Sequence, residues 1–130
     1  MISSAHLAQA VALTTTLTAS TNTHLTLGLY NHTIRIEWTP GTTNNVLTFA
    51  IDTRITGGEW VQQMEWDESA TAGTYTKTNR LNSHTATGTT VTGLTVLLDE
   101  HCNELRVRYA ESEAGSSTKG TITVHAYSSD

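Results

Sequence analysis

The residues whose side chains could do chemistry are few, and most lie where turns are expected. Asp99, Glu100, His101 and Cys102 form the one local group of residue types that bind metal ions. Four consecutive residues of a loop cannot all point at one ion, and no second pair of ligands follows at the spacing of a zinc site. We therefore expect a solvated polar turn at this position and no metal-binding residue.

Carboxylates also gather near Trp66, where Glu65, Asp67 and Glu68 invite comparison with the paired acids of a glycosidase. Carboxylates a few residues apart at a strand end more often form a charged rim. The sequence contains no G-x-S-x-G elbow and no glycine-rich phosphate loop, and its histidines lack a paired nucleophile. It thus predicts no catalytic residue, no cofactor-binding residue and no cofactor, and we expect that the protein is not an enzyme. The histidines are His6, His24, His32, His84, His101 and His125.

Aromatic and arginine side chains offer a different kind of site, for binding a partner. The aromatic side chains could stack against sugar rings, or the tryptophans could pack inside a core, and we favour the core. Trp66 is closest to a strand end and is the best candidate for exposure. Arg35 and Glu37 fall outward on one expected strand. Arg106 and Arg108 do so on another, and for both pairs cross-strand ion pairing and a subunit contact are open interpretations. The aromatics in question are Trp38, Trp60, Trp66, Tyr30, Tyr75, Tyr109 and Tyr127.

The element around which the chain is organised is the stretch 46–66, which predicts two strands joined by a tight turn. Side chains alternate between two faces along a strand. The first arm places Leu47, Phe49 and Ile51 on one face, and the second arm places Trp60, Gln62, Met64 and Trp66 on one face. Residues 56–59 supply the turn, because their two glycines adopt positive φ without a Cβ clash.

The same alternation predicts further strands along the chain, about eight in all. This number and spacing favour an all-β antiparallel sandwich, either a jelly roll or an immunoglobulin-like fold. We expect residues 1–22 to form an N-terminal arm or first strand and residues 23–130 to form the sandwich domain. The other expected elements are a strand over 11–19 or a helical turn over 4–10, a strand over 24–30 with Leu25, Leu27 and Leu29 on one face, a turn at 31–32, strands over 33–39, 91–98, 104–111 and 121–127, an edge strand over 75–81, and loops over 83–90 and 114–120.

Composition excludes several classes of protein. The formal net charge is −5 with only 7 Lys and Arg residues, whereas nucleic-acid binders need clustered cations to displace phosphate counterions. No stretch of 18 apolar residues could cross a membrane. The first positive side chain is Arg35, so we expect no signal peptide. Cys102 is the only cysteine, and we expect a small buried hydrophobe in a protein made and folded in a reducing cytoplasm.

A resemblance rests on two segments. The order of Asp52, the turn glycines Gly57 and Gly58, and Trp60, followed by the pair of stretches 104–108 and 120–124, resembles small β-sandwich structural proteins of tailed-phage virions. Among these the chain is most similar to capsid decoration (cement or auxiliary head) proteins, over about residues 30–127. The resemblance implies a homo-oligomer, with a trimer favoured, that binds the major capsid protein or another virion protein at the capsid surface. It implies that the chain stabilises the head lattice after synthesis in the host cytoplasm.

An alternative stays open beside this resemblance. Carbohydrate-binding and adhesion modules of fibres or cell-surface proteins share the G-G-x-W hairpin and the sandwich fold. Such a module needs an exposed row of aromatic side chains, whereas a decoration protein needs faces that pack against other proteins. An uncharged N-terminal stretch and about a fifth of residues as threonine suit packing against protein surfaces.

Overall fold

The computed structural model describes residues 1–42, 45–69, 73–75, 84–86, 92–112 and 118–130. All regular structure in these residues is β-strand, and among them no helix is long and apolar enough to cross a bilayer. The strands are β1 (Ile2–Ala12), β2 (Thr18–Ala19), β3 (His24–Leu25), β4 (Asn31–Thr39), β5 (Val46–Arg54), β6 (Val61–Ser69), β7 (Gly73–Tyr75), β8 (His84–Ala86), β9 (Thr92–Asp99), β10 (Glu104–Ser112) and β11 (Thr121–Ser129).

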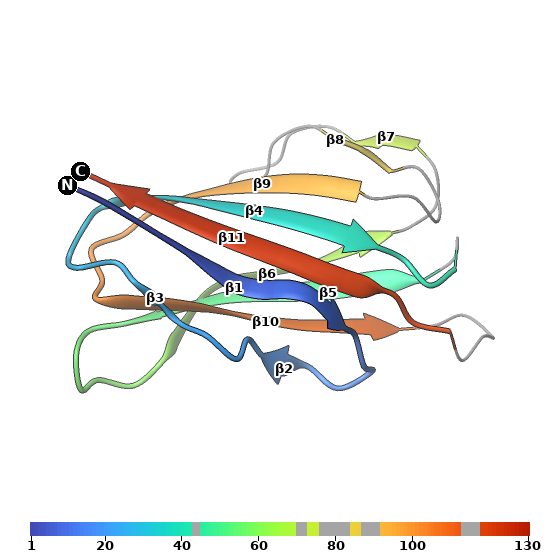
Figure 1. Ribbon diagram of the computed structural model, residues 1–130, viewed down its shortest axis with the longest axis horizontal. Coiled ribbons are helices and arrows are strands. Elements are labelled where there is room, and N and C mark those ends of the chain that lie inside the picture. The colour runs from blue at the N-terminus through green and yellow to red at the C-terminus, as the bar shows by residue number, and fades with distance from the viewer. Residues whose placement is uncertain (43–44, 70–72, 76–83, 87–91, 113–117) are drawn as a thin grey trace.

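Two antiparallel sheets form a sandwich (Figure 1). Sheet A has the order β1-β11-β4-β9, and sheet B has the order β2-β10-β5-β6, with β3 also paired to β10. With β2 and β3 counted as one interrupted strand and the separate β7-β8 pair left out of the count, the first strand pairs with the eighth, the second with the seventh, the third with the sixth and the fourth with the fifth. That nesting is the jelly roll, which is built from two Greek keys. The all-β sandwich prediction is confirmed, and the strand order selects the jelly roll.

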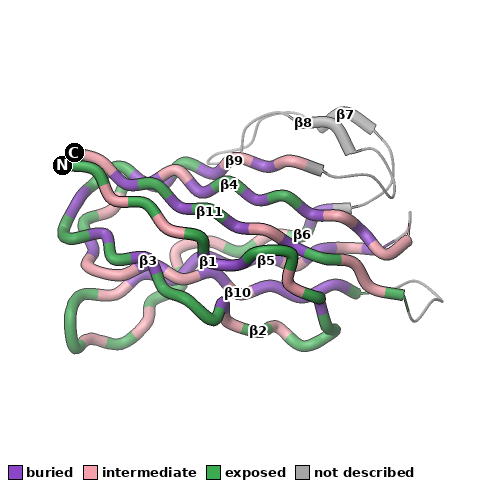
Figure 2. The backbone as a smooth tube through the Cα atoms, viewed as in Figure 1, coloured by how far each residue is buried: buried purple, intermediate pink, exposed green. Residues whose placement is uncertain are grey.

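The core lies between the two sheets, and buried residues alternate with outward ones along β4, β9 and β11 (Figure 2). Predictions for the central strands are confirmed: Ile34, Ile36 and Trp38 of β4 are fully buried. The inward faces of β9, β10 and β11 agree with the sequence in the same way. Trp38 and Phe49 are the largest fully buried side chains, and both come from central strands of their sheets.

The hairpin of β5 and β6 is present, but the two arms do not keep one register. Ile51 pairs with Met64 while Asp52 pairs with Gln62, so Gln63 is an extra residue that forms a β-bulge. A bulge reverses which face the following side chains meet. Met64 therefore faces the core, whereas Gln62 lies on the outer face of sheet B. Trp60 lies on the same outer face, where its ring contacts Arg54 and Arg106. Placing Trp60 on the same face as Met64 was wrong for this reason.

The N-terminal stretch differs from both expectations for residues 4–19. Neither a helical turn over 4–10 nor a strand over 11–19 forms, because β1 pairs with β11 from Ile2 to Ala12. Two register shifts break the alternation along β1 and turn Leu7 and Ala8 both inward. Ala10, with φ of +47°, takes up the irregularity and donates its backbone N–H to Thr123 Oγ1 at 2.9 Å.

The free edge of β1 is tied to the other sheet. Ser3 Oγ donates to the Leu25 carbonyl oxygen at 2.6 Å, and Asn22 Nδ2 donates to the His6 carbonyl oxygen at 3.4 Å. Leu25 belongs to β3 of sheet B, so these bonds link the edges of the two layers. The first strand therefore lies on this chain's own sandwich.

The strand expected over 24–30 is mostly absent, and its three leucines do not share one face, because Leu29 is buried whereas Leu25 and Leu27 are exposed. Only His24 and Leu25 are in a strand, and Leu25 and Leu27 are more than half exposed while His24 and Thr26 are buried. The polar side chains turn inward because the interior offers them hydrogen-bond partners. Leu27 takes a φ of +56° in the turn that follows.

Two short segments differ from their predicted structure. Residues 31–32, expected as a turn, are the first residues of β4, where Asn31 pairs with Ser129. Residues 84–86, expected in a loop, are strand β8 paired with β7. The rest of the edge strand expected over 75–81 and of the loops over 83–90 and 114–120 falls largely outside the described residues.

Candidate functional site

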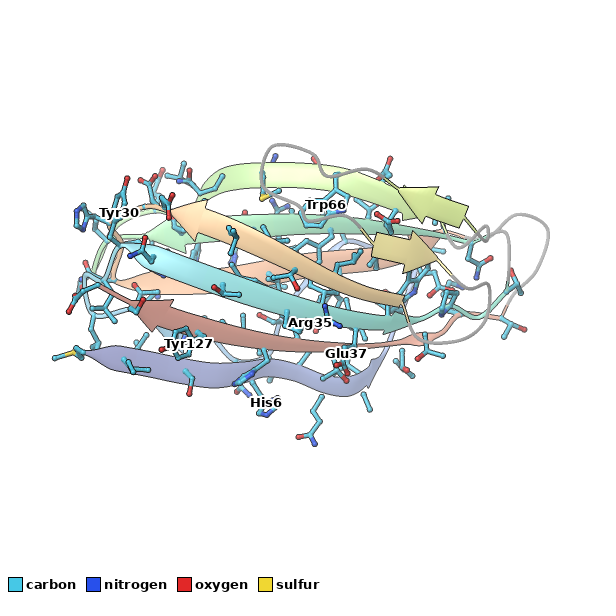
Figure 3. The ribbon with its side chains drawn as sticks, turned by 90° about the horizontal axis from the view of Figure 1, so that it is seen from above. His6, Tyr30, Arg35, Glu37, Trp66 and Tyr127 are labelled. Atoms are coloured by element: carbon cyan, nitrogen blue, oxygen red, sulfur yellow. The ribbon has the colours of Figure 1, made fainter. Side chains whose placement is uncertain are left out.

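The outward face of sheet A is a broad surface with few charges, which we call the A face. Its residues stand in cross-strand rows, and the row Ser4, Tyr127, Thr33 and Leu97 crosses all four strands. Leu97 is 52% exposed and Tyr127 is 40% exposed. Arg35, Glu37 and Asp99 carry the only charges among the described outward side chains of the four paired strands. Figure 3 shows Arg35, Glu37, Tyr127 and His6 on this face.

The next row of the A face holds two imidazoles and a guanidinium. His6 of β1 pairs with His125 of β11, and their rings are stacked with centroids 4.4 Å apart and planes 18° apart. Arg35 is the following residue of the row, but its Nη1 donates to Thr95 Oγ1 at 3.0 Å. The guanidinium also lies where a Cβ on Gly93 would stand. Arg35 therefore leans toward β9 and away from the two histidines.

The outward face of sheet B, the B face, holds a closed ion cluster. Asp52, only 2% exposed, accepts bonds from Arg106 Nε at 2.8 Å and from Arg108 Nε at 2.8 Å. Arg108 Nη2 reaches both Asp52 Oδ1 at 3.0 Å and Gln62 Oε1 at 2.6 Å. The hydrogen bonds to Asp52 raise the pKa of Arg108 above its already high ordinary value and outweigh burial, which lowers it. This confirms the ion-pairing interpretation for Arg106 and Arg108.

Trp60 covers the same cluster from the side. The guanidinium carbons of Arg54 and Arg106 lie 4.4 Å and 4.6 Å from the centre of its ring, which is cation–π distance. Arg54 in turn donates to both carboxylate oxygens of Glu104 at 3.2 Å and 3.0 Å. Five charged groups of the B face thus bind one another: Asp52, Arg54, Glu104, Arg106 and Arg108.

A fully buried carboxylate, Glu111, anchors the end of the sandwich near residues 40–45. It accepts bonds from Trp38 Nε1 at 2.7 Å, Asn45 Nδ2 at 2.5 Å and Gly41 N at 2.9 Å, and a weaker pair from Gly120 N. Four donors replace the water that a charged carboxylate loses on burial. Glu111 therefore holds two loops against β10, a structural role that the alternation pattern gave no reason to expect.

Two buried histidines meet at Ser128 near the other end. His32 Nε2 lies 2.7 Å from the Glu100 carbonyl oxygen, which can only accept, so this nitrogen carries the proton. His32 Nδ1 is then an acceptor for the Ser128 hydroxyl at 2.7 Å, and Ser128 Oγ accepts from His24 Nε2 at 2.8 Å. His24 Nδ1 is left buried without a hydrogen-bond partner.

These bonds explain the behaviour of His24 as a base. Protonation would place an N–H at Nδ1, where no acceptor waits. Burial first, and then the nearby His32 and His125, lower the pKa of His24 from 6.5 to about 4. His24 is therefore neutral at physiological pH and acts as a hydrogen-bond donor of the interior.

Cys102 is buried beside this network, as expected for a small hydrophobe. The Thr26 hydroxyl donates to the Cys102 carbonyl oxygen, which leaves the Thr26 oxygen as an acceptor for the thiol at 3.3 Å. Burial is the main cause that raises the pKa of the Cys102 thiol. The thiol is therefore held in its protonated, unreactive form.

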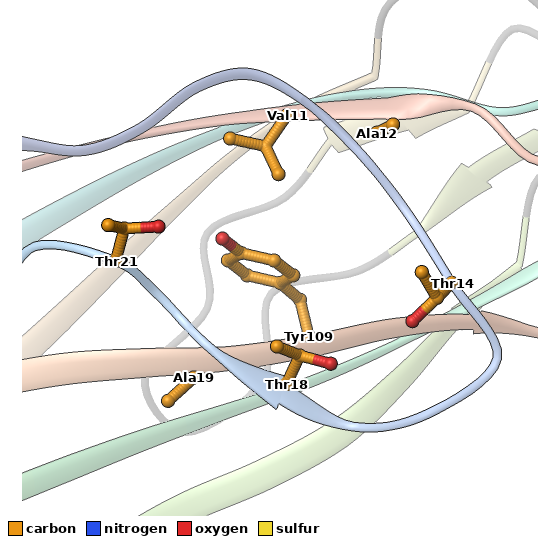
Figure 4. Close-up of a pocket in the computed structure, with 7 residues that line it drawn as sticks. All are labelled: Val11, Ala12, Thr14, Thr18, Ala19, Thr21 and Tyr109. Atoms are coloured by element: carbon orange, nitrogen blue, oxygen red, sulfur yellow. The ribbon is translucent and has the colours of Figure 1, made fainter.

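A small pocket of about 100 Å³ opens between the end of β1 and β2 (Figure 4). Tyr109 stands in it with its hydroxyl directed between Val11 and Thr21. Tyr109 is 4% exposed, burial raises the pKa of its phenol, and no described residue gives the hydroxyl a hydrogen bond. Thr14 and Thr18 both donate to the Thr16 carbonyl oxygen. The lining residues are Val11, Ala12, Thr14, Thr18, Ala19, Thr21 and Tyr109.

The acidic and metal-capable residues singled out in the sequence do not converge. His101 Nδ1 lies 3.1 Å from the Gly28 carbonyl oxygen and its ring contacts Tyr30, while Cys102 turns inward. Within the described ranges, no group of three His, Cys, Asp or Glu side chains could hold a metal ion. Asp67 is exposed and accepts a bond from Thr48, whereas Glu68 is buried.

The aromatic residues are distributed over the interior and both faces. Trp38 is in the core, and Trp66 is half-buried with its ring 4.8 Å from that of Phe49 (Figure 3). Trp60 lies on the B face. Tyr30 and Tyr127 are the exposed aromatics among the described side chains: Tyr30 immediately precedes β4, and Tyr127 lies on β11 in the A face. They do not form a row.

Comparison with known proteins gives similarity to solved structures and none to curated sequences. No protein-family profile matches the chain, and no curated protein sequence matches it. Among solved structures it is similar to the "Globular Domain of Zebrafish Complement 1qA protein", at 8% identity and a TM-score of 0.45. The alignment covers 98% of this chain and 94% of that chain. We draw no functional conclusion from this similarity, and the fold assignment rests on the strand order.

Proposed function

We propose that the chain is a virion structural protein, a capsid decoration (cement) protein that binds the phage head lattice and stabilises it. Its partner is the major capsid protein or another virion protein, and its place is the capsid surface. The observation that carries the proposal is the A face. Interface cores are poor in charged residues, and the A face has few charges across four strands, with exposed Leu97 and Tyr127 among side chains that are mostly Thr, Ser and His.

The A face is also rigid, which suits a surface that packs against another protein. Each row is held by backbone pairing across β1, β11, β4 and β9, over a core of fully buried side chains. A preorganised face loses little conformational entropy on binding. Exposed Leu97 and Tyr127 then supply apolar area in one cross-strand row, toward the end of the face where β4 begins.

We further propose that the chain assembles as a homo-oligomer, with a trimer favoured, and that the A face takes part. Leu97→Asp should abolish both self-association and binding to shells assembled from the capsid protein. Val61→Asp is the matched control, because Val61 is 56% exposed but belongs to sheet B. Sedimentation should give a species of three times the 14.1 kDa chain mass for the wild type and Val61→Asp. The proposal fails if the wild-type chain does not bind shells, or if Leu97→Asp binds them as the wild type does.

A second candidate is a carbohydrate-binding module, and the Tyr109 pocket favours it. The free phenol hydroxyl, the threonine oxygens and the apolar wall suit part of a neutral polyhydroxy ligand. A glycan array should then give hits that Tyr109→Phe loses, since this change removes the hydroxyl and keeps the ring. An array without hits would remove this candidate.

A further inference from the structure

On the A face, the edge strand β1 and its neighbour β11 carry two imidazoles that lie opposite each other. His6 and His125 are directly opposed in the ladder of β1 and β11, with the pairs Ala5–Ala126 and Ser4–Tyr127 continuing the same register. Directly opposed residues have Cβ atoms about 4.5–5.5 Å apart. Both side chains are exposed, and the ring planes differ by only 18°. The backbone therefore fixes two imidazoles side by side, facing solvent.

We propose that His6 and His125 together bind a divalent transition-metal ion of the Ni²⁺, Cu²⁺ and Zn²⁺ group. Imidazole nitrogen is a preferred ligand of these ions. With metal–nitrogen bonds of about 2.0–2.1 Å and a tetrahedral angle, the two bound nitrogens stand about 3.3 Å apart. The ring centres are 4.4 Å apart, so side-chain rotations that tilt the rings together bring one nitrogen of each onto a shared ion.

The electrostatic surroundings permit a cation at this position. Arg35, the next residue of the row, is the nearest fixed positive charge on the A face. Its guanidinium is bonded to Thr95 and lies over Gly93, toward the far edge of the sheet. Glu37 lies on the same face, one row from Arg35, and the whole chain has a formal charge of −5.

His6 and His125 supply two ligands to the ion. The described residues contain no group of three His, Cys, Asp or Glu side chains that could supply a third. Water completes the coordination shell. A two-imidazole site without further protein ligands binds reversibly, and Cu²⁺ should be bound most tightly of the three ions, following the usual order of affinities. The site requires one copy of the chain and does not rest on the proposed capsid function, although it lies on the A face, so assembly through that face would compete with the ion.

The test is a titration of the tag-free chain with CuCl₂ and NiCl₂ at neutral pH by isothermal calorimetry. We expect one ion per chain, and affinity reduced at least tenfold in His6→Asn and in His125→Asn. The matched control is His101→Asn, which removes another exposed histidine and should leave the affinity unchanged. Thermal unfolding checks that each variant is folded.

A spectroscopic measurement separates the shared site from two independent ones. The electron paramagnetic resonance spectrum of the Cu²⁺ complex should show two coordinated nitrogens in the wild type and one in either single variant. The proposal is overturned if the wild type binds no more tightly than the His6→Asn, His125→Asn double variant. It is also overturned if the His101→Asn variant shows the larger loss.

Discussion

The two outward faces of the sandwich use their polar side chains in opposite ways. On the B face, Arg106 and Arg108 converge on one buried carboxylate, Asp52, and Trp60 lies against the cluster. On the A face, Arg35 makes one bond to Thr95, and the histidines, Tyr127 and Leu97 face solvent. A charged strand face can thus be closed by its own ion pairs, whereas a less charged one keeps its side chains exposed. We expect the B face to contribute to stability and propose the A face for binding.

The largest effect on stability is expected for Asp52→Ala. The change leaves Arg106 and Arg108 without their common partner, and removing one member of a buried ion pair typically costs several kcal/mol. Because the two arginine side chains are about a quarter exposed, we expect a loss of about 3 kcal/mol in the free energy of unfolding. Urea unfolding measures it. Glu37→Ala on the A face is the control and should change stability by less than about 0.5 kcal/mol. Equal effects would contradict the comparison.

A smaller loss in the free energy of unfolding is expected at acidic pH, and it arises from His24 in the interior between the two sheets. The pKa of His24 falls from 6.5 to about 4 on folding, so between these pH values the unfolded chain binds more protons than the folded chain. The free energy of unfolding should therefore be constant above pH 6.5 on this account and decrease as the pH falls toward 4. The lost stability is about 2–3 kcal/mol, at 1.36 kcal/mol for each pKa unit.

His24→Gln isolates this contribution, since a glutamine amide can still donate to Ser128 but does not titrate. Urea unfolding of both proteins at several pH values between 4 and 7 gives the comparison. The difference between wild type and variant should depend on pH only within that window. A difference that is constant with pH would show that His24 is not the group responsible.

The smallest of these effects should follow Trp60→Ala. The substitution removes the ring that Arg54 and Arg106 contact, and cation–π contacts at partly exposed sites contribute about 0.5–1 kcal/mol each. We expect a loss of about 1–2 kcal/mol, while Tyr127→Ala on the A face should cost less and should instead weaken self-association. Thermal unfolding and sedimentation of the two variants measure these outcomes. A stable Trp60→Ala chain that no longer self-associates would reverse the roles of the two faces.

The alternation of apolar residues was enough to predict the central strands, because both sheets bury one face completely. Ile34, Ile36 and Trp38 are inward as predicted, and the same holds for Leu105 and Val107. The pattern failed where the backbone departs from regular pairing. The extra residue Gln63 moved Trp60 to the B face, and the irregular pairing of β1 hid a strand that begins at Ile2.

The sites were less predictable than the fold, because they depend on residues distant in the sequence. His6 and His125 are 119 positions apart and meet only through the pairing of the first and last strands. His24 and Ser128 are 104 positions apart and meet through a side-chain hydrogen bond. Outward placement of Arg106 and Arg108 was predictable from alternation, but their convergence on Asp52 required the pairing of β10 with β5.

The tied edge of β1 has a consequence for how copies of this chain can meet. An uncharged terminal strand with open backbone groups would serve as a template on which a second copy could add a strand, and growth by that route has no natural end. Here Asn22 occupies one carbonyl of β1, Ser3 binds across to β3, and the irregularity at Ala10 bends the strand out of flat pairing. For the proposed homo-oligomer, these features oppose strand addition at β1 and leave contact through side chains on a face, which favours closed assemblies of fixed size over fibrils.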